Sequence, residues 1–301
     1  MQLKTIPESR LATLLASGDF VLRIGPFSVQ LKADFDRVPE LIQRLYADCR
    51  IEAPTGLADF HLRLSRPRNL RRFYRPQVRF LIDGSSPFAP FPADHAFPLF
   101  EWGLNWSVAS HSHQFLMLHS AVVEKNGKAV LLPAWPGSGK STLAAALVYR
   151  GWRLLSDEFG LIRPGTNAMI PFPRCVPLKN ESIPILRDFA PEAVIGPVFT
   201  KTRKGDVAHL KPPAESVQRS NESAVPGFVL FPRFTPGQHA ILKPLPKARA
   251  FLKLAGNAFN YELLGEAGFR TVASLIRGCD TYLFHYDDLD EAVQTLDSLV
   301  E

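Results

Sequence analysis

Cysteine is scarce in this chain of 301 residues, with three copies at positions 49, 175 and 279. No two of them form a Cys-x-x-Cys pair, and an odd, widely spaced set favours neither a disulfide framework nor a structural zinc site. Free cysteines are typical of a reducing compartment. We therefore expect a cytoplasmic protein.

Long apolar runs are also lacking. No segment approaches the roughly 18 consecutive apolar residues of a membrane-spanning helix, and the first residues lack the charged-then-apolar layout of a secretory signal. The apolar fraction of 46% is ordinary for a globular protein. We expect a soluble protein without a membrane partner, whose length exceeds what one hydrophobic core usually organises.

Neither sign of charge dominates strongly, since 35 Lys and Arg face 29 Asp and Glu for a net charge of +6. A basic balance suits an acidic partner, but a nucleotide and a phosphorylated product are acidic partners too. The charge therefore does not require nucleic acid, and we expect none.

The most specific motif is the segment 134–142, Ala-Trp-Pro-Gly-Ser-Gly-Lys-Ser-Thr, between an apolar run and a helix-forming one. A phosphate-binding loop reads Gly, four residues, Gly-Lys, then Ser or Thr, because successive backbone N–H groups must turn inward around phosphates. Ala134 replaces the first glycine, which is tolerated unless a left-handed dihedral is needed there. The alternative is an ordinary corner between a strand and a helix.

Each part of this loop has an expected task. Gly137 and Gly139 allow positive φ angles, Lys140 would reach the outer phosphates, and the helix N-terminus would favour the anion. The Ser141 hydroxyl would ligate Mg²⁺. The residues expected to bind ATP are Pro136, Gly137, Ser138, Gly139, Lys140, Ser141 and Thr142.

Two carboxylates follow the next predicted strand, residues 153–156, at Asp157 and Glu158. One carboxylate, the Ser141 hydroxyl and nucleotide oxygens would suffice for Mg²⁺, and the second carboxylate could accept the proton of an attacking hydroxyl. The candidate metal ligands are therefore Ser141 with Asp157 or Glu158. The alternative is a plain acidic turn after a strand.

The loop is preceded by a predicted hairpin, with strands at 114–123 and 129–132 around a turn at 125–128, and His119 lies fifteen residues before Ala134. Together with Gly-Ser-Gly-Lys-Ser and the segment 150–158, Arg-Gly-Trp-Arg-Leu-Leu-Ser-Asp-Glu, this region resembles the catalytic half of HPr kinase/phosphorylase. It resembles more closely the HPr kinase-related proteins, some of which modify ribosomal peptides. The family shares its hairpin with phosphoenolpyruvate carboxykinase.

The resemblance implies an α/β P-loop domain with a mixed sheet, and an ATP-dependent kinase that phosphorylates a hydroxyl, favouring serine, on a protein or peptide. It makes Asp157 the general base, Glu158 and Ser141 metal ligands, and His119 an active-site histidine. Related enzymes form oligomers, so a homo-oligomer is implied as well. Two rival functions stay open, a P-loop ATPase or GTPase and a non-catalytic nucleotide-sensing module.

The chain departs from the family pattern in two places. Glu158 stands where the family has a second aspartate, and residues 171–181 replace the later Glu-Val-Arg-Gly signature of the classical enzyme. The resemblance therefore supports kinase activity more strongly than it supports the reverse phosphorylase reaction.

Residues 1–92 do not share the resemblance and predict a small α+β domain, with strands at 20–24, 27–31, 60–64 and 78–82 and a helix at 38–49. The proline-rich stretch 84–97 places the boundary with the catalytic domain, 93–301, which begins with an aromatic core helix at 98–110. Seven arginines between positions 63 and 79 indicate either a dock for an acidic substrate or a solvated surface.

The last part of the chain predicts a strand at 228–231, helices at 247–254, 261–276 and 289–300, and a strand at 281–286. Residues 200–210 predict a mobile loop whose Arg203 and Lys204 could close over a phosphoryl group, or a plain solvated turn. Asp287 and Asp288 predict a helix cap.

Overall fold

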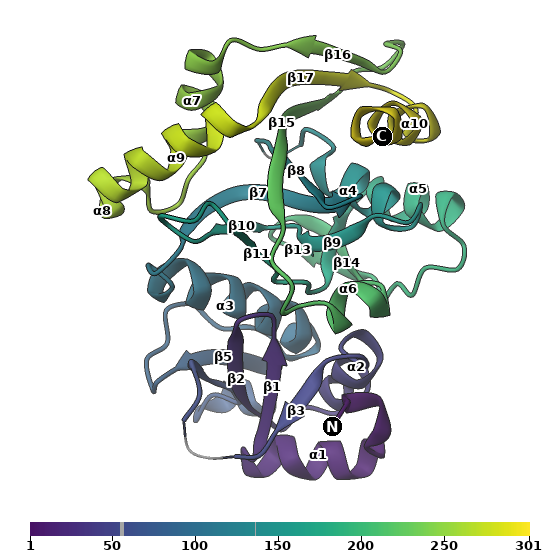
Figure 1. Cartoon of the computed structure of the whole chain (residues 1–301). Helices are drawn as coiled ribbons and strands as arrows, with labels where there is room; N and C mark the ends of the chain where they lie inside the picture. The colour runs from purple at the N-terminus through teal and green to yellow at the C-terminus, as the bar shows by residue number, and fades with distance from the viewer. Residues whose placement is uncertain (55–56, 136) are drawn as a thin grey trace.

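The computed structural model describes residues 1–54, 57–135 and 137–301, so Pro136 of the predicted loop lies outside the described residues. The protein is of the α/β class with mixed sheets, as the sequence predicts. One sheet near the N-terminus and a larger one near the C-terminus are separated by helix α3 (Figure 1). None of the described helices combines the length and the apolar character that crossing a membrane requires.

The N-terminal sheet is mixed, with a parallel β2–β4 pair between antiparallel ones. It confirms both predicted strand pairs. In spatial order its strands are β3 (Arg50–Glu52), β1 (Phe20–Ile24), β2 (Phe27–Ala33), β4 (Phe60–Ser65), β5 (Gln77–Ile82) and β6 (Phe91–Pro92). The helices of this part are η1 (Leu3–Thr5), α1 (Glu8–Ser17), α2 (Arg37–Leu45), η2 (Leu70–Arg72) and η3 (Ala93–His95).

Helix α3 (Ala96–His111) is the predicted aromatic core helix. Phe97, Phe100 and Val108 are buried in a cluster that contains Phe80 of β5, and the same cluster continues into Phe159 of the C-terminal half. The helix therefore packs on the N-terminal sheet although it follows the proline-rich stretch. A division of the chain at residue 92 would separate it from the sheet that it covers.

The C-terminal sheet contains the predicted hairpin, since β7 and β8 are antiparallel, while β8 lies parallel to β15. In spatial order its strands are β11 (Met169–Ile170), β10 (Phe159–Ile162), β7 (Leu116–Lys125), β8 (Lys128–Pro133), β15 (Val225–Phe234), β17 (Asp280–Tyr286) and β16 (Ile241–Pro244), with β9 (Arg153–Ser156) paired to β7. One face packs on α4 (Lys140–Val148), α5 (Ser182–Phe189) and α10 (Leu289–Val300), and the other on α7 (Lys247–Ala255) and α9 (Glu266–Gly278).

In the last third of the chain one helix prediction was wrong, and the predicted helix cap was confirmed. The single helix expected at 261–276 is two helices, α8 (Tyr261–Leu264) and α9, because Gly265 has φ 53° and ψ −121°, a conformation outside the helical region. Asp288 does cap α10, since its Oδ1 accepts a hydrogen bond from the Glu291 N–H at 2.8 Å.

The mobile loop expected at 200–210 is instead a hairpin of β13 (Phe199–Thr202) and β14 (Gly205–Leu210), which pairs with β12 (Val176–Lys179) and is followed by α6 (Ala214–Gln218). The Thr202 hydroxyl fixes its turn by donating to the Gly205 carbonyl oxygen at 2.6 Å and accepting from the Lys204 N–H at 3.1 Å. Arg203 and Lys204 therefore occupy a defined hairpin tip.

Candidate active site

The predicted phosphate loop joins the end of β8 to the start of α4 at Lys140. Gly137 and Gly139 have φ angles of 85° and 87°, which confirms the expected need for left-handed freedom. A Cβ at Gly139 would lie 2.6 Å from the Tyr286 hydroxyl oxygen. The loop is held from the neighbouring strands, since Tyr286 donates to the Gly139 carbonyl oxygen at 3.2 Å and the Phe234 N–H to that of Ser138 at 3.0 Å.

Two features of the loop fit a phosphate group. The Ser138 hydroxyl is buried and has no hydrogen-bond partner among the described residues, which is unusual for a buried polar atom. The loop also leads into the N-terminus of α4, where backbone N–H groups lack intrahelical acceptors and favour an anion. Thr142, in contrast, donates its hydroxyl to Ser182 Oγ at 2.9 Å, so that hydroxyl already has a protein partner.

Lys140 connects the loop to the acidic pair. Its Nζ donates to the backbone carbonyl oxygen of Asp157 and lies 3.4 Å from Asp157 Oδ1 and 3.8 Å from Glu158 Oε2. Only 8% of the Lys140 side chain is exposed. In this structure the ammonium therefore neutralises the two carboxylates that the sequence places beside it.

The two acids have different surroundings. Asp157 is 3% exposed and its Oδ2 accepts a hydrogen bond from the Ser141 hydroxyl at 2.9 Å. Glu158 is 19% exposed and its Oε2 lies 3.3 Å from His119 Nε2. Burial alone would raise the pKa of Glu158, but Lys140 and the hydrogen bond with His119 lower that pKa below its ordinary value. Glu158 is therefore ionised at neutral pH.

Strand pairing explains why these residues meet. Strand β7 pairs with β10 through its first half, which sets His119 opposite Phe159, and with β9 through its second half. Asp157 and Glu158 occupy the bend between β9 and β10. The structure thus brings together His119, Lys140, Ser141, Asp157 and Glu158, all of which the sequence singled out.

A metal ion would depend on ligands from outside the protein. Within the described parts of the chain no group of three or more His, Cys, Asp or Glu side chains could hold one. The Ser141 hydroxyl and the Asp157 carboxylate are adjacent oxygen donors of the kind that Mg²⁺ prefers, and nucleotide phosphates would complete the set.

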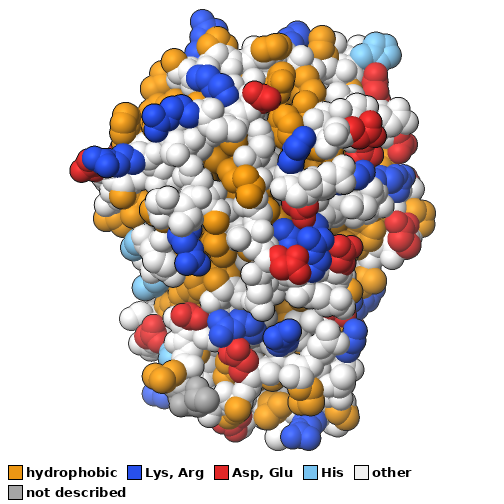
Figure 2. Space-filling view, in the orientation of Figure 1, with side chains coloured by type: hydrophobic (Ala, Val, Ile, Leu, Met, Phe, Trp, Pro, Cys, Tyr) orange, Lys and Arg blue, Asp and Glu red, His pale blue; other side chains and the backbone are white. Residues whose placement is uncertain are grey.

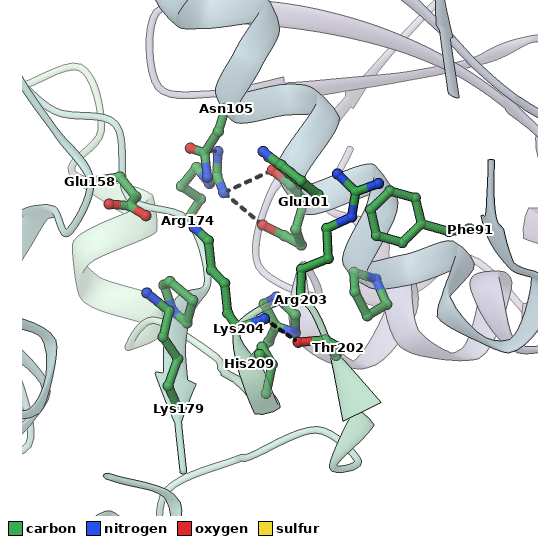
Figure 3. Close-up of a pocket in the computed structure, with 14 residues that line it drawn as sticks. Phe91, Glu101, Asn105, Glu158, Arg174, Lys179, Thr202, Arg203, Lys204 and His209 are labelled. Atoms are coloured by element: carbon green, nitrogen blue, oxygen red, sulfur yellow. Dashed lines mark hydrogen bonds and ion pairs between the residues drawn. The ribbon is translucent and has the colours of Figure 1, made fainter. Parts of the chain in front are cut away.

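A cavity lies beside Glu158, between α3 and the β13–β14 hairpin (Figure 3). The N-terminal half supplies one wall, and strand β12 and the hairpin supply the others. Most of its lining was missed from the sequence, although the alternating burial of β12 places Pro177 and Lys179 on one face. The side chains that line it are Phe91, Pro98, Glu101, Trp102, Asn105, Glu158, Arg174, Pro177, Lys179, Thr202, Arg203, Lys204, Val207 and His209.

Arg203 and Lys204 line this cavity and contact aromatic rings of the N-terminal half. The Arg203 guanidinium lies 5.1 Å from the centre of the Phe91 ring and 5.6 Å from that of Trp102, and Lys204 Nζ lies 6.0 Å from that of Trp102. These are cation–π distances. The hairpin tip is thereby fixed on the N-terminal half.

A scan against family models and a search of curated proteins both found no match to this chain. The chemistry of the site therefore rests on its own residues and their geometry.

Proposed function

We propose that this protein is an ATP-dependent kinase with the HPr kinase-like P-loop fold, which transfers the γ-phosphoryl group to a hydroxyl, favouring serine, of a protein or peptide. The observation that carries the proposal is the contact network of the loop. Lys140 and Ser141 both contact Asp157, while Glu158 connects Lys140 to His119 and borders the cavity.

The chain's own groups divide the work. The loop amides and the free Ser138 hydroxyl would hold phosphates, and Ser141 with Asp157 would hold Mg²⁺. When bound, Mg²⁺ neutralises charge on the phosphate oxygens. A carboxylate of the acidic pair accepts the proton of the acceptor hydroxyl. The resemblance assigns that task to Asp157, whereas Glu158 has the greater exposure and lines the cavity.

The cavity favours a kinase over the two rival functions. A P-loop ATPase or GTPase needs room only for a water molecule, whereas this cavity combines aromatic walls with several charged groups, as sites for organic ligands do. A nucleotide sensor needs the loop but has no use for a carboxylate at the mouth of a second cavity. Both rivals predict that no acceptor is phosphorylated.

The loop assignment is tested with the variant Lys140→Ala. Mg-ATP at roughly a hundred times its dissociation constant should stabilise the wild type by about 2.7 kcal/mol. The variant should melt earlier on its own, because the buried Asp157 loses its cation, and should gain nothing from Mg-ATP. Lys201→Ala, at an exposed lysine, is the control. An equal gain in wild type and Lys140→Ala would refute the assignment, and mass spectrometry of candidate peptides with Mg-ATP tests transfer itself.

A further inference from the structure

The charges around the cavity do not cancel. Arg174 is neutralised, since its Nη2 lies 2.8 Å from Glu101 Oε2 and its Nη1 donates to Asn105 Oδ1 at 2.7 Å. His209 is neutral because burial lowers its pKa to about 4. What remains is a single carboxylate, Glu158, against three cations, which are Lys179, Arg203 and Lys204.

Those three cations have no carboxylate of their own. In the described parts of the chain, none of Lys179, Arg203 and Lys204 forms an ion pair. Arg203 and Lys204 stack on aromatic rings, but Lys179 does not have that compensation. Lys179 is half-buried while Arg203 and Lys204 are exposed. An excess of cations around a cavity favours the binding of an anion there.

Lys179 lies at the centre of this imbalance. Its side chain is half-buried, and burial is the main cause that lowers the pKa of its ammonium, with Lys204 acting in the same direction and Glu158 opposing it. Close by, His209 has a buried Nδ1 with no hydrogen-bond partner among the described residues. Both groups line the cavity, and a ligand oxygen could satisfy them.

The position of the cavity indicates what kind of ligand this is. Glu158 belongs both to the cavity wall and to the network of His119 and Lys140, so the cavity borders the place where the proposed phosphoryl transfer occurs. In Figure 3, Glu158 and Lys179 lie on the side of the cavity across from Phe91 and Arg203. The apolar wall of Phe91, Pro98 and Trp102 would contact the carbon skeleton of an organic molecule.

We propose that this cavity binds the phosphoryl acceptor, and that the acceptor carries an acidic group, a carboxylate or a phosphate, held by Lys179 and Lys204 with its hydroxyl toward Glu158. The proposal rests on the kinase function proposed above. The hydroxyl proton passes to the acidic pair and the acceptor oxygen bonds to the γ-phosphorus. The bond from that phosphorus to the bridging oxygen breaks, and its electron pair stays on the departing ADP.

Binding is tested first without nucleotide, by calorimetric titration with O-phospho-L-serine and with neutral N-acetyl-L-serinamide. The acidic probe should bind the wild type, and Lys179→Gln should weaken that binding by about tenfold or more, the effect of losing a charged hydrogen-bond partner. Lys201→Gln, at an exposed lysine of the β13–β14 hairpin, should bind normally. No binding of the acidic probe, or binding that Lys179→Gln leaves unchanged, overturns the proposal.

A structural role for Lys179 is separated by melting. Because burial lowers the pKa of Lys179 despite the attraction of Glu158 and Asp157, Lys179→Gln should melt at the wild-type temperature or above it. A clearly lower melting temperature would make Lys179 a structural residue and overturn its assignment as a ligand for the acceptor.

Mass spectrometry after incubation with Mg-ATP identifies the source of the acidic group. One pair of acceptors is free L-serine and N-acetyl-L-serinamide, and the other is a peptide with Asp on both sides of its serine and the same peptide with Asn. Transfer should favour the acidic member of one pair, and Lys179→Gln should reduce that preference. Equal transfer within both pairs, zero included, overturns the acceptor assignment, whereas stabilisation by Mg-ATP in the same protein would leave nucleotide binding standing.

Discussion

The phosphate loop and the neighbouring cavity are built in opposite ways. The contacts that join His119, Lys140, Ser141, Asp157 and Glu158 to one another all fall within residues 119–158. The cavity takes its lining from residues 91 to 209 and from both halves of the molecule. A site made from neighbouring elements can be found from a motif, whereas one assembled across the chain becomes visible only when the fold is known.

The two regions also differ in how their charges are satisfied. In the loop, the Lys140 ammonium already has Asp157 and Glu158 as partners. In the cavity, Lys179 has no such partner among the described residues. On the outer face drawn in Figure 2, Lys, Arg, Asp and Glu side chains are interspersed. Four changes test this contrast.

The largest expected effect separates the two carboxylates that join the regions. Asp157→Asn and Glu158→Gln keep size and much of the hydrogen bonding, so whichever residue is the base should lose roughly 10² to 10⁴ in kcat. If Asp157→Asn loses kcat and also needs a different Mg²⁺ concentration, Asp157 would act both as the base and as a metal ligand. Single-turnover transfer and Mg-ATP binding should be measured in parallel, and wild-type rates in both variants would place the base elsewhere, with His119 next.

A second change breaks the ion pair that links the cavity wall of α3 to the C-terminal half. Arg174 and Glu101 side chains are each 4% exposed, and Glu101 also accepts the Tyr46 hydroxyl at 2.6 Å. Arg174→Met should cost about 3 to 5 kcal/mol in the free energy of unfolding, because Glu101 stays buried without its cation. Urea titration measures this, and adding Glu101→Gln to the variant should recover much of the loss. A loss below 1 kcal/mol would show that the pair is dispensable.

A third change uses the pH dependence of stability to test whether His209, in the wall of the cavity, is neutral in the folded protein. The pKa of His209 is about 4 when folded against about 6.5 for an exposed histidine, so between these values the unfolded chain binds more protons. Stability is complete above pH 6.5 and falls by about 3 kcal/mol as pH drops toward 4. His209→Gln should flatten that part of the stability curve, while His239→Gln, at a histidine 91% exposed, should not. Parallel curves for wild type and His209→Gln would contradict the expected burial.

The smallest effect concerns the arginine segment, residues 63–79, none of whose side chains lines the cavity. Arg66 lies 4.7 Å from the centre of the Phe35 ring, and in the described residues none of the arginines from 63 to 79 forms an ion pair. Changing Arg68, Arg71, Arg72 and Arg75 to Glu should raise KM for an acidic peptide several-fold at low salt and leave kcat near wild type. Each exposed pair contributes only about 0.2 to 1 kcal/mol. The matching Gln variants should give a smaller rise, and an unchanged KM would refute docking.

What the sequence could predict follows from the range of the interactions involved. The β7–β8 hairpin, the loop and helix α4 are set by adjacent residues, and all three were found. The hairpin at 200–210 was mistaken for a loop because its tip is polar and its partner strand β12 lies more than twenty residues earlier. Lys179 was not recognised because the cavity that it lines is assembled from segments far apart in the chain, which no local pattern records.

The contacts that hold the predicted phosphate loop come from residues far along the chain, which affects the order in which the protein folds. Strand β8 needs β15 as its parallel neighbour, and Gly139 needs the Tyr286 hydroxyl, 147 residues further along the chain. A nascent chain that still lacks residue 286 contains the whole motif but not the contacts that hold its shape. Such non-local pairing forms late and slowly. On the proposed function, nucleotide affinity should therefore arise only once the C-terminal strand has docked.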